Sequence, residues 1–417
     1  SSPTITAAPS FATQVTYSTG SKPTSVALGD VNGDGRFDLI TANFDSSTAS
    51  VLLGNGNGTF QTKTDFVTGT NPQSVALGDV NGDGRLDLIT ANSGSNNVSV
   101  FLGNGTGTFG AKTDFSTGTN PRSVALGDVN GDGTLDIVTA NQASGNVSVL
   151  LGTGTGTFAT QATYLALNAA QAYAVTLGDV NGDGKLDIVA GNRSGSNGSL
   201  LLGNGDGTFQ ASQVFTVGNP QVFVDLGDVN GDGKLDIVAA KAGNDISVLL
   251  GNGNGTFQSP QTVGSGTNPR SVTLRDVNGD GKLDILTANY GSTNASVLLG
   301  NGNGTFKSAV TFATGTNSRS ATLGDVNGDG RLDIIAANFN SDNASVLLGT
   351  GGSAITATFS PQQTFATGNG ASAVALGDLN RDGKLDMVTA NLSSDNVSVL
   401  LGNGNGTLQT QATFATG

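Results

Sequence analysis

A nine-residue phrase, written DVNGDGRLD in residues 79–87, recurs with small variations eight times in this 417-residue sequence. Successive phrases begin 48 to 53 residues apart, so the spacing is nearly constant. A fixed period of this length is the signature of a repeated supersecondary unit, and the length therefore predicts one array, not several unrelated domains. The phrases begin at Asp30, Asp79, Asp128, Asp179, Asp228, Asp276, Asp325 and Asp378.

One full unit, residues 68–115, contains four short stretches rich in β-branched and small residues and separated by Gly, Asn and Ser. Such stretches predict strands, and no segment has apolar residues at helical spacing over the length of a helix. The expected strands of this unit are Ser74–Val80, Leu86–Ala91, Val98–Leu102 and Thr108–Phe115.

A single four-stranded unit cannot bury both of its faces, whereas units arranged around an axis cover one another. Small residues of the first strand, such as Ala76 and Gly78, suit crowding near such an axis. We therefore predict an all-β fold, an eight-bladed β-propeller of four-stranded antiparallel blades. The alternative is an open solenoid built of the same units.

The expected domain organisation is an N-terminal extension in residues 1–10 and one propeller in residues 11–417. The repeats run approximately over residues 21–66, 70–115, 119–164, 170–215, 219–263, 267–312, 316–365 and 369–414. Residues 11–20 (FATQVTYSTG) match the fourth-strand segment, as do residues 408–417 (LQTQATFATG), so one strand is surplus. Either one terminal strand completes the last blade and the other lies over it, or the spare strand adds to a sheet edge of another molecule.

The acidic residues are all Asp, and 24 of the 32 lie in the repeated phrases. The formal net charge of −14 therefore indicates missing cations more than a basic partner, since eight divalent ions would bring it to about +2. An acidic chain without a basic run is unsuited to nucleic acid, and no apolar run approaches the length of a membrane span. We expect neither nucleic-acid binding nor membrane insertion.

Within each phrase, side-chain oxygens fall at positions 1, 3, 5 and 9, and the residue at position 7 can offer its backbone carbonyl. Glycines at positions 4 and 6 allow the chain to curl so that these oxygens converge. Several carboxylates and no nitrogen or sulfur ligands favour Ca²⁺ over Mg²⁺. We predict up to eight Ca²⁺ ions, one per blade, with these ligands: Asp30, Asn32, Asp34, Arg36 and Asp38; Asp79, Asn81, Asp83, Arg85 and Asp87; Asp128, Asn130, Asp132, Thr134 and Asp136; Asp179, Asn181, Asp183, Lys185 and Asp187; Asp228, Asn230, Asp232, Lys234 and Asp236; Asp276, Asn278, Asp280, Lys282 and Asp284; Asp325, Asn327, Asp329, Arg331 and Asp333; Asp378, Asn380, Asp382, Lys384 and Asp386.

The core DVNGDGRLDLITAN, followed by VSVFLGNGTGTF, resembles the FG-GAP/VCBS repeat, which also forms the head of integrin α-subunits. The resemblance extends from Phe11 to Gly417 and implies a loop between the first two strands of each blade that binds Ca²⁺ through its Asp and Asn residues. EF-hand and dockerin loops share the opening of the phrase, but they need an acid at position 12 and a following helix, where this chain has Thr90 in a strand-like run. Arg381 replaces a glycine in the eighth loop and Arg275 precedes the sixth, so these two sites depart from the pattern.

Catalysis is unfavourable because the chain has no His, Cys or Glu, and most of its Asp is assigned to metal. Eight similar loops suggest a stabilising role for Ca²⁺ and not a regulatory one, and weak sites of this kind fill outside cells. The chain begins without Met or a signal-peptide pattern, which indicates a processed terminus. We expect a secreted or cell-surface protein that is not an enzyme.

Three functions remain open at this stage: an adhesion or binding module for a protein or glycan ligand, a lectin, and a subunit of a fibre or surface layer that binds copies of itself. The first two would use residues that differ between repeats. Arg122, Arg270 and Arg319 share one position of the repeat and could line one rim. The candidate aromatic platforms are Tyr17, Tyr164, Tyr173, Tyr290, Phe44, Phe223 and Phe339.

Overall fold

The computed structural model describes residues 14–55, 60–166, 171–193, 195–218, 223–241, 243–324, 331–341, 343–349, 363–380, 382–403, 408 and 411–413. Within them the chain is all β. The strands are β1 (Gln14–Ser18), β2 (Pro23–Gly29), β3 (Asp38–Asn43), β4 (Thr48–Leu52), β5 (Thr64–Val67), β6 (Pro72–Gly78), β7 (Asp87–Asn92), β8 (Asn97–Phe101), β9 (Thr113–Ser116), β10 (Pro121–Gly127), β11 (Asp136–Asn141), β12 (Asn146–Leu150), β13 (Ala162–Leu165), β14 (Ala172–Gly178), β15 (Asp187–Asn192), β16 (Asn197–Leu201), β17 (Gln213–Thr216), β18 (Phe223–Gly227), β19 (Asp236–Ala240), β20 (Asp245–Leu249), β21 (Gln261–Gly264), β22 (Pro269–Arg275), β23 (Asp284–Asn289), β24 (Asn294–Leu298), β25 (Val310–Ala313), β26 (Ser318–Gly324), β27 (Asp333–Asn338), β28 (Asn343–Leu347), β29 (Gln363–Ala366), β30 (Ala371–Gly377), β31 (Asp386–Asn391), β32 (Asn396–Leu400) and β33 (Gln411–Thr413).

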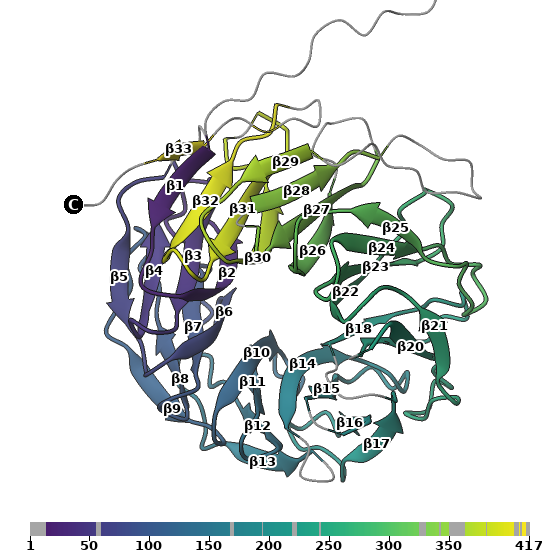
Figure 1. Cartoon of the computed structure of the whole chain (residues 1–417). Helices are drawn as coiled ribbons and strands as arrows, with labels where there is room; N and C mark the ends of the chain where they lie inside the picture. The colour runs from purple at the N-terminus through teal and green to yellow at the C-terminus, as the bar shows by residue number, and fades with distance from the viewer. Residues whose placement is uncertain are drawn as a thin grey trace, which may run out of the picture.

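The described strands form seven four-stranded sheets and one five-stranded sheet. Each four-stranded sheet is antiparallel and uses four consecutive strands, as in β6-β7-β8-β9. The first strands of successive sheets lie side by side around a central axis, and β2 lies beside β30, so the sheets form a closed ring (Figure 1). The fold is a β-propeller, and the open solenoid is excluded.

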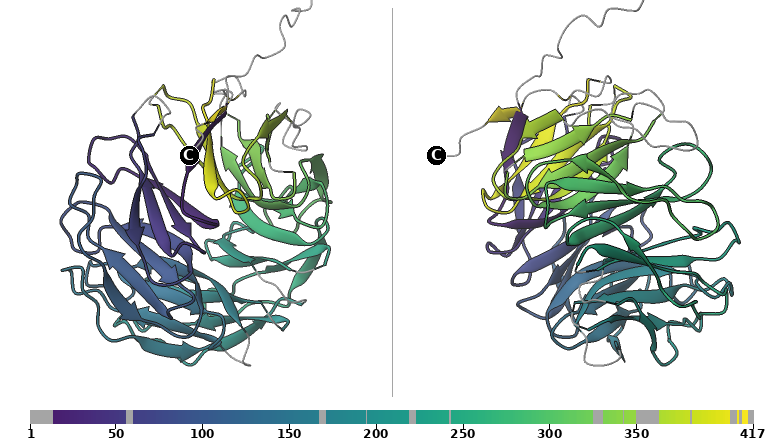
Figure 2. Two further views of the ribbon diagram at one scale, coloured as in Figure 1. Left: turned by 60° about the vertical axis from the view of Figure 1, so that its left-hand side comes forward. Right: turned by 45° about the vertical axis from the view of Figure 1, so that its right-hand side comes forward.

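The sheet that closes the ring has a fifth strand in addition to the four of each other blade. Its order is β30-β31-β32-β1-β33. The N-terminal strand β1 pairs antiparallel with β32 in the place that the fourth strand has elsewhere, and β33 pairs parallel with β1 at the outer edge. Figure 2 shows the purple β1 lying against the yellow strands of the other terminus. Both terminal segments thus belong to one sheet of the same molecule, as the first of the two sequence-based alternatives expects.

The strand boundaries of the second repeat differ from the expected ones mainly at the first and fourth strands. β6 begins two residues early, at Pro72, and β9 begins at Thr113, not at Thr108. The intervening GTF segment instead turns back toward the end of β8 through an isolated bridge between Gly103 and Phe109. The Phe109 ring thereby packs edge-on against Phe66 of the preceding sheet, with centroids 5.2 Å apart.

The hydrophobic core lies between neighbouring sheets. One cluster joins Ile89 and Val100 of the second repeat to Ile137 and Leu150 of the third, and all four are buried. Side chains of this size contribute about 1.5–3 kcal/mol each when fully buried. Near the axis the sheets are crowded, as expected: a Cβ on Gly78 would lie 2.7 Å from Leu126 Cδ1 of the next sheet.

A second position where only glycine fits is the end of the third strand. A Cβ on Gly103 would lie 2.3 Å from the oxygen of Leu86, which belongs to the backbone and not to a flexible side chain. We expect Gly103→Ala to lower the free energy of unfolding by about 1–3 kcal/mol, the usual cost of overpacking, in urea denaturation with calcium present. Gly264→Ala is the matched control, because a Cβ there has no neighbour within 4 Å. Equal losses in the two variants would contradict this account.

Candidate functional site

Each described acidic loop curls around the carboxylate at its first position. In the loop of residues 79–87, Asp79 Oδ1 accepts hydrogen bonds from the amides of Gly82 (2.7 Å) and Asp83 (3.1 Å), and Oδ2 accepts one from Gly84 (2.7 Å). Gly82 and Gly84 have φ of 75° and 79°, the left-handed region that favours glycine. The predicted curl is therefore present, and loops 30–38, 128–136, 179–187, 228–236 and 276–284 repeat these bonds with small variations.

The ninth position has a structural role that the sequence does not reveal. Asp87 is fully buried; its Oδ2 accepts from the amide of Val80 (2.8 Å) and its Oδ1 from the amide of Gly103 (2.7 Å). This carboxylate thus ties the loop to the end of the third strand. Burial raises the pKa of the equivalent Asp38 and Asp284 to about 6 and that of Asp386 to about 7, although backbone hydrogen bonds oppose the shift.

The loops fit a hard cation by the chemistry of their donors. Positions 1, 3 and 5 present carboxylate and amide oxygens on one exposed turn, and the ninth carboxylate lies below it. The described side chains do not form a group of three or more acids already drawn together around a metal position. The Asn81 amide nitrogen points at Asp83 Oδ2 (3.2 Å), and a cation ligated by both side chains needs that amide turned over. The calcium ligands stay a prediction, and Asp325, Asn327 and Asp329 lie outside the described residues.

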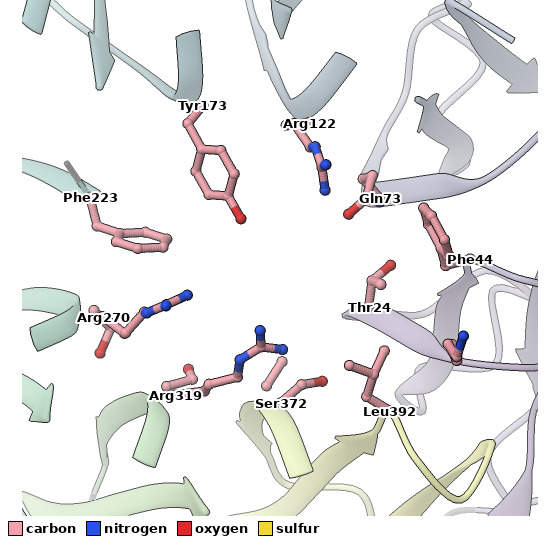
Figure 3. A pocket seen from close by; sticks show the side chains of 14 residues that line it. Thr24, Phe44, Gln73, Arg122, Tyr173, Phe223, Arg270, Arg319, Ser372 and Leu392 are labelled. Atoms are coloured by element: carbon pink, nitrogen blue, oxygen red, sulfur yellow. The ribbon is translucent and has the colours of Figure 1, made fainter. Parts of the chain in front are cut away.

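A second candidate site lies where the first strands begin. In seven of the described first strands the pairing with the second strand shifts by one residue, which leaves one residue of a β-bulge without a partner. A bulge redirects a side chain, and here the bulge residues point toward the axis (Figure 3). They are Thr24, Gln73, Arg122, Tyr173, Arg270, Arg319 and Ser372.

These residues line a cavity of about 540 Å³ at one end of the central axis, which we call the axial mouth. Phe223, from the start of β18, and the residues that follow two second strands, Phe44 and Leu392, complete its wall (Figure 3). Every sheet of the ring contributes to this cavity. The acidic loops follow the other ends of the same first strands, about 20 Å away for a seven-residue strand.

The arginines of the axial mouth rest on aromatic rings. Arg270 lies 4.6 Å and Arg319 lies 5.9 Å from the centroid of Tyr290, and Arg319 also lies 4.6 Å from that of Phe339. Across the mouth, Arg122 and Arg193 lie 5.9 Å and 5.6 Å from the ring of Tyr173. Cation–π contacts of this length fix the guanidinium groups in place.

The electrostatics of the mouth are cationic. Burial and the neighbouring Arg270 lower the pKa of Arg319, and burial lowers the pKa of Arg122, yet both guanidinium groups stay protonated because the ordinary pKa of arginine lies far above neutral pH. Arg122 Nε donates to the Gln142 side chain (2.6 Å), whereas the buried Nε of Arg270 has no hydrogen-bond partner among the described residues. No carboxylate belongs to the described lining of the cavity.

The structure thus brings together most of the residues singled out from the sequence. The shared rim of Arg122, Arg270 and Arg319 is confirmed, and Tyr290, Phe339, Tyr173, Phe44 and Phe223 gather around it. Tyr164 does not belong to it, because its ring packs edge-on against Phe209 between two sheets. The side chain of Tyr17 lies outside the described residues. Arg193 is an addition, and only its contact with Tyr173 identifies it.

A buried polar network on the same side of the ring was also missed. Asn92 closes the second strand and donates from Nδ2 to Asn97 Oδ1 and to Ser99 Oγ, both at 2.9 Å. The same pair recurs, for example, as Asn43 and Ser50 and as Asn391 and Ser398. These asparagines carry the turn next to the mouth, so the residues beyond them are held on a rigid base.

Comparison with known proteins identifies the repeat. The family model described as "FG-GAP-like repeat" matches residues 30–90, 79–139, 128–190, 179–239, 228–287, 276–336 and 325–389. No curated protein matches the chain. Within the described residues, no helix is long and apolar enough to cross a membrane.

Several solved structures share the fold. The Dos1 propeller superposes with a TM-score of 0.62 at 12% identity, over 97% of this chain and 99% of that one. A protein from Lactobacillus plantarum gives 0.55 at 14% identity, over 87% and 98%. An Agrocybe aegerita lectin specific for non-reducing terminal N-acetylglucosamine gives 0.47 at 24% identity, over 70% and 80%, which is too distant a superposition to carry an argument. From the matched repeats, which span residues 30–389, the chain belongs to the FG-GAP-like repeat family.

Proposed function

We propose that this protein is an extracellular, calcium-stabilised propeller that acts as a non-catalytic adhesion or binding module and takes its protein or glycan ligand at the axial mouth. The observation that carries the proposal is the contrast between the mouth and the rest of the repeat. The second and third strands are nearly identical around the ring, whereas the bulge position holds Thr, Gln, Arg, Tyr or Ser. Variable side chains on a rigid, repeated scaffold are characteristic of binding surfaces.

A binding role, not a catalytic one, follows from the side chains that the mouth offers. The chain has no His, Cys or Glu, and the described lining of the mouth includes no Asp. General acid–base and nucleophilic catalysis most often use these groups. Arginine, serine, threonine and glutamine instead supply hydrogen bonds for recognition.

Calcium enters this proposal as a structural ion. A bound Ca²⁺ would neutralise the carboxylates that each loop gathers, and positions 1, 3, 5, 7 (through its carbonyl) and 9 would hold it. Without a cation, mutual repulsion of these carboxylates opposes folding. Weak sites of this type, with dissociation constants of roughly 10⁻⁴–10⁻³ M, fill in the calcium-rich extracellular medium, which supports the proposed location.

A fibre or surface-layer subunit is the second candidate, and the closing sheet supports it. β1 and β33 lie in segments of nearly matching sequence, but of these two strands only β1 pairs with β32. The β1 of a second copy could therefore occupy the same place and link the molecules, as in strand exchange. A lectin that stacks sugars on its rings has less support, because guanidinium groups already lie over Tyr290, Phe339 and Tyr173.

Removal of calcium should destabilise the protein, and the size of this effect should depend on pH. Because the buried carboxyls have raised pKa values, the metal-free folded state binds more protons than the unfolded state between roughly pH 4 and 7. Their protonation thus stabilises the folded state at low pH, and this contribution is lost as pH rises through about 6–7. We expect EDTA to lower the melting temperature by many degrees at pH 7.5 and by much less at pH 5.

The control for this measurement is re-addition of Ca²⁺ or Mg²⁺ after dialysis. Calcium should restore the melting temperature at pH 7.5, and equimolar Mg²⁺ should restore less of it, because Mg²⁺ demands tighter octahedral geometry. An unchanged melting curve after exhaustive EDTA dialysis would contradict the structural role of calcium.

Blocking the axial mouth should weaken ligand binding. Ala373 lines the cavity next to the Ser372 bulge, and Ala373→Trp would fill it. We expect ligands found on glycan and peptide arrays with the calcium-loaded protein to lose at least tenfold in affinity. Val310→Trp is the control, because Val310 is half-exposed on the outermost strand of its sheet. If a ligand binds both variants equally well, its binding site lies outside the axial mouth.

Electron microscopy and light scattering separate the two candidate functions. A binding module should give dispersed rings with the mass of one chain. A fibre subunit should give ordered polymers, and deletion of residues 1–20 should abolish them, because β1 is the strand available for exchange. Deletion of residues 409–417, which removes β33 instead, is the matched control. Polymers that persist without β1 would exclude this mode of assembly.

A further inference from the structure

The axial mouth collects positive charge on a chain whose net charge is −14. Arg122, Arg270 and Arg319 enter it from three different sheets, and Lys22 also belongs to its lining. Lys22 pairs with Asp45, whereas the three arginines form no ion pair with a described carboxylate. Partly buried guanidinium groups without a counter-charge favour the binding of an anion.

Arg270 and Arg319 share one aromatic partner, and Arg270 is a neighbouring charge of Arg319. Both lie over the ring of Tyr290, and Arg319 also lies over the ring of Phe339. Figure 3 shows both side chains extending toward the centre of the mouth, so their terminal N–H groups can reach a ligand bound there. The Nε of Arg270 is buried and has no hydrogen-bond partner among the described residues. An oxyanion received by both arginines would accept hydrogen bonds from their terminal N–H groups and reduce the repulsion between the two charges.

The opposite side of the mouth has a different chemistry. Thr24 and Gln73 lie across the cavity from Arg270, with the ring of Phe44 beside them (Figure 3). This side carries hydroxyl and amide groups and one apolar face, but no unpaired charge. A ligand that fits both sides has one anionic group and a neutral, hydrogen-bonding remainder, and about 540 Å³ leaves room for one or two sugar rings.

We propose that the axial mouth binds an acidic saccharide, with its oxyanion on Arg270 and Arg319 and its hydroxyl groups toward Thr24 and Gln73. This inference rests on the proposed function and names the ligand class of the same site. The oxyanion is a uronic carboxylate or a sulfate ester, since the planar guanidinium fork accepts either. In this proposal Tyr290 and Phe339 orient the arginines, and Phe44 is the ring available to stack on a sugar.

The test is titration calorimetry of the calcium-loaded protein with four probes: digalacturonate, a singly sulfated disaccharide, neutral digalactose and an aspartate-containing tripeptide. We expect at least one of the two acidic saccharides to bind tenfold or more tightly than digalactose and the tripeptide, with affinity falling as salt is added. The relative affinity of the first two probes identifies the oxyanion. Comparable affinity for digalactose, or tighter binding of the tripeptide, would overturn the proposal.

The variants locate the interaction. Arg319→Gln should lower the affinity for the acidic saccharide by tenfold or more and leave the affinity for digalactose unchanged. Arg122→Gln should lower the affinity for the acidic saccharide less. Lys112→Gln removes the same charge from the outer rim of the ring, where Lys112 pairs with Asp114, and should have no effect. Thermal melts with calcium show whether each variant is folded, and if Arg319→Gln unfolds, Arg270→Gln replaces it. Equal losses in Arg319→Gln and Lys112→Gln would overturn the proposal.

Failure of this inference can be told apart from failure of the proposed function. If no acidic saccharide binds but array ligands still require an open mouth, as judged by Ala373→Trp, the ligand class is wrong and the binding site stands. If the array ligands and the acidic saccharides all bind Ala373→Trp as tightly as the unmodified protein, both proposals fail.

Discussion

The buried carboxylate at the end of each acidic loop is the interaction on which the repeat depends. The Asp87 carboxylate accepts one hydrogen bond from an amide at the start of its own loop and one from an amide at the end of the third strand. A single side chain therefore joins three consecutive strands. Burial makes this charge costly, and the two hydrogen bonds offset only part of that cost. The requirement for a glycine at Gly103 follows, because the amide must approach the carboxylate where any side chain would strike Leu86.

This arrangement separates the tasks of the two ends of the first strand. Its C-terminal end must enter the loop in one geometry, which explains why the phrase is repeated so faithfully. Its N-terminal end carries a β-bulge, and the bulge residue makes no pair with the second strand. Because neither the ladder nor the loop constrains that side chain, it varies from Thr24 to Tyr173 without disturbing the sheet. The same strand therefore provides both the conserved geometry of the fold and the variable surface of the mouth.

The sequence predicts the all-β propeller and most strands because the repeat supplies the same signal many times. It predicts the curl of the loops because glycines stand where φ is positive. It does not reveal the bulge, since Pro72 and Gln73 carry no pattern that fixes their pairing, and it therefore predicts a first strand that begins two residues late. Nor does it reveal the order of the closing sheet, because residues 11–20 and 408–417 fit one position equally well and only one of them can fill it.

The arginines of the axial mouth show the same limit of sequence-based prediction for the candidate site. Their common position in the repeat is visible in the sequence, but their partners are not, because Tyr290 and Phe339 lie 20 residues further along the chain from Arg270 and Arg319. Antiparallel pairing of the first and second strands brings each ring beside the bulge. A ring covered by a guanidinium group is no longer a platform for a neutral sugar, and the guanidinium group held by it is pre-oriented for an anion. The same aromatic residues that suggest a lectin in the sequence thus suggest an oxyanion receptor in the structure.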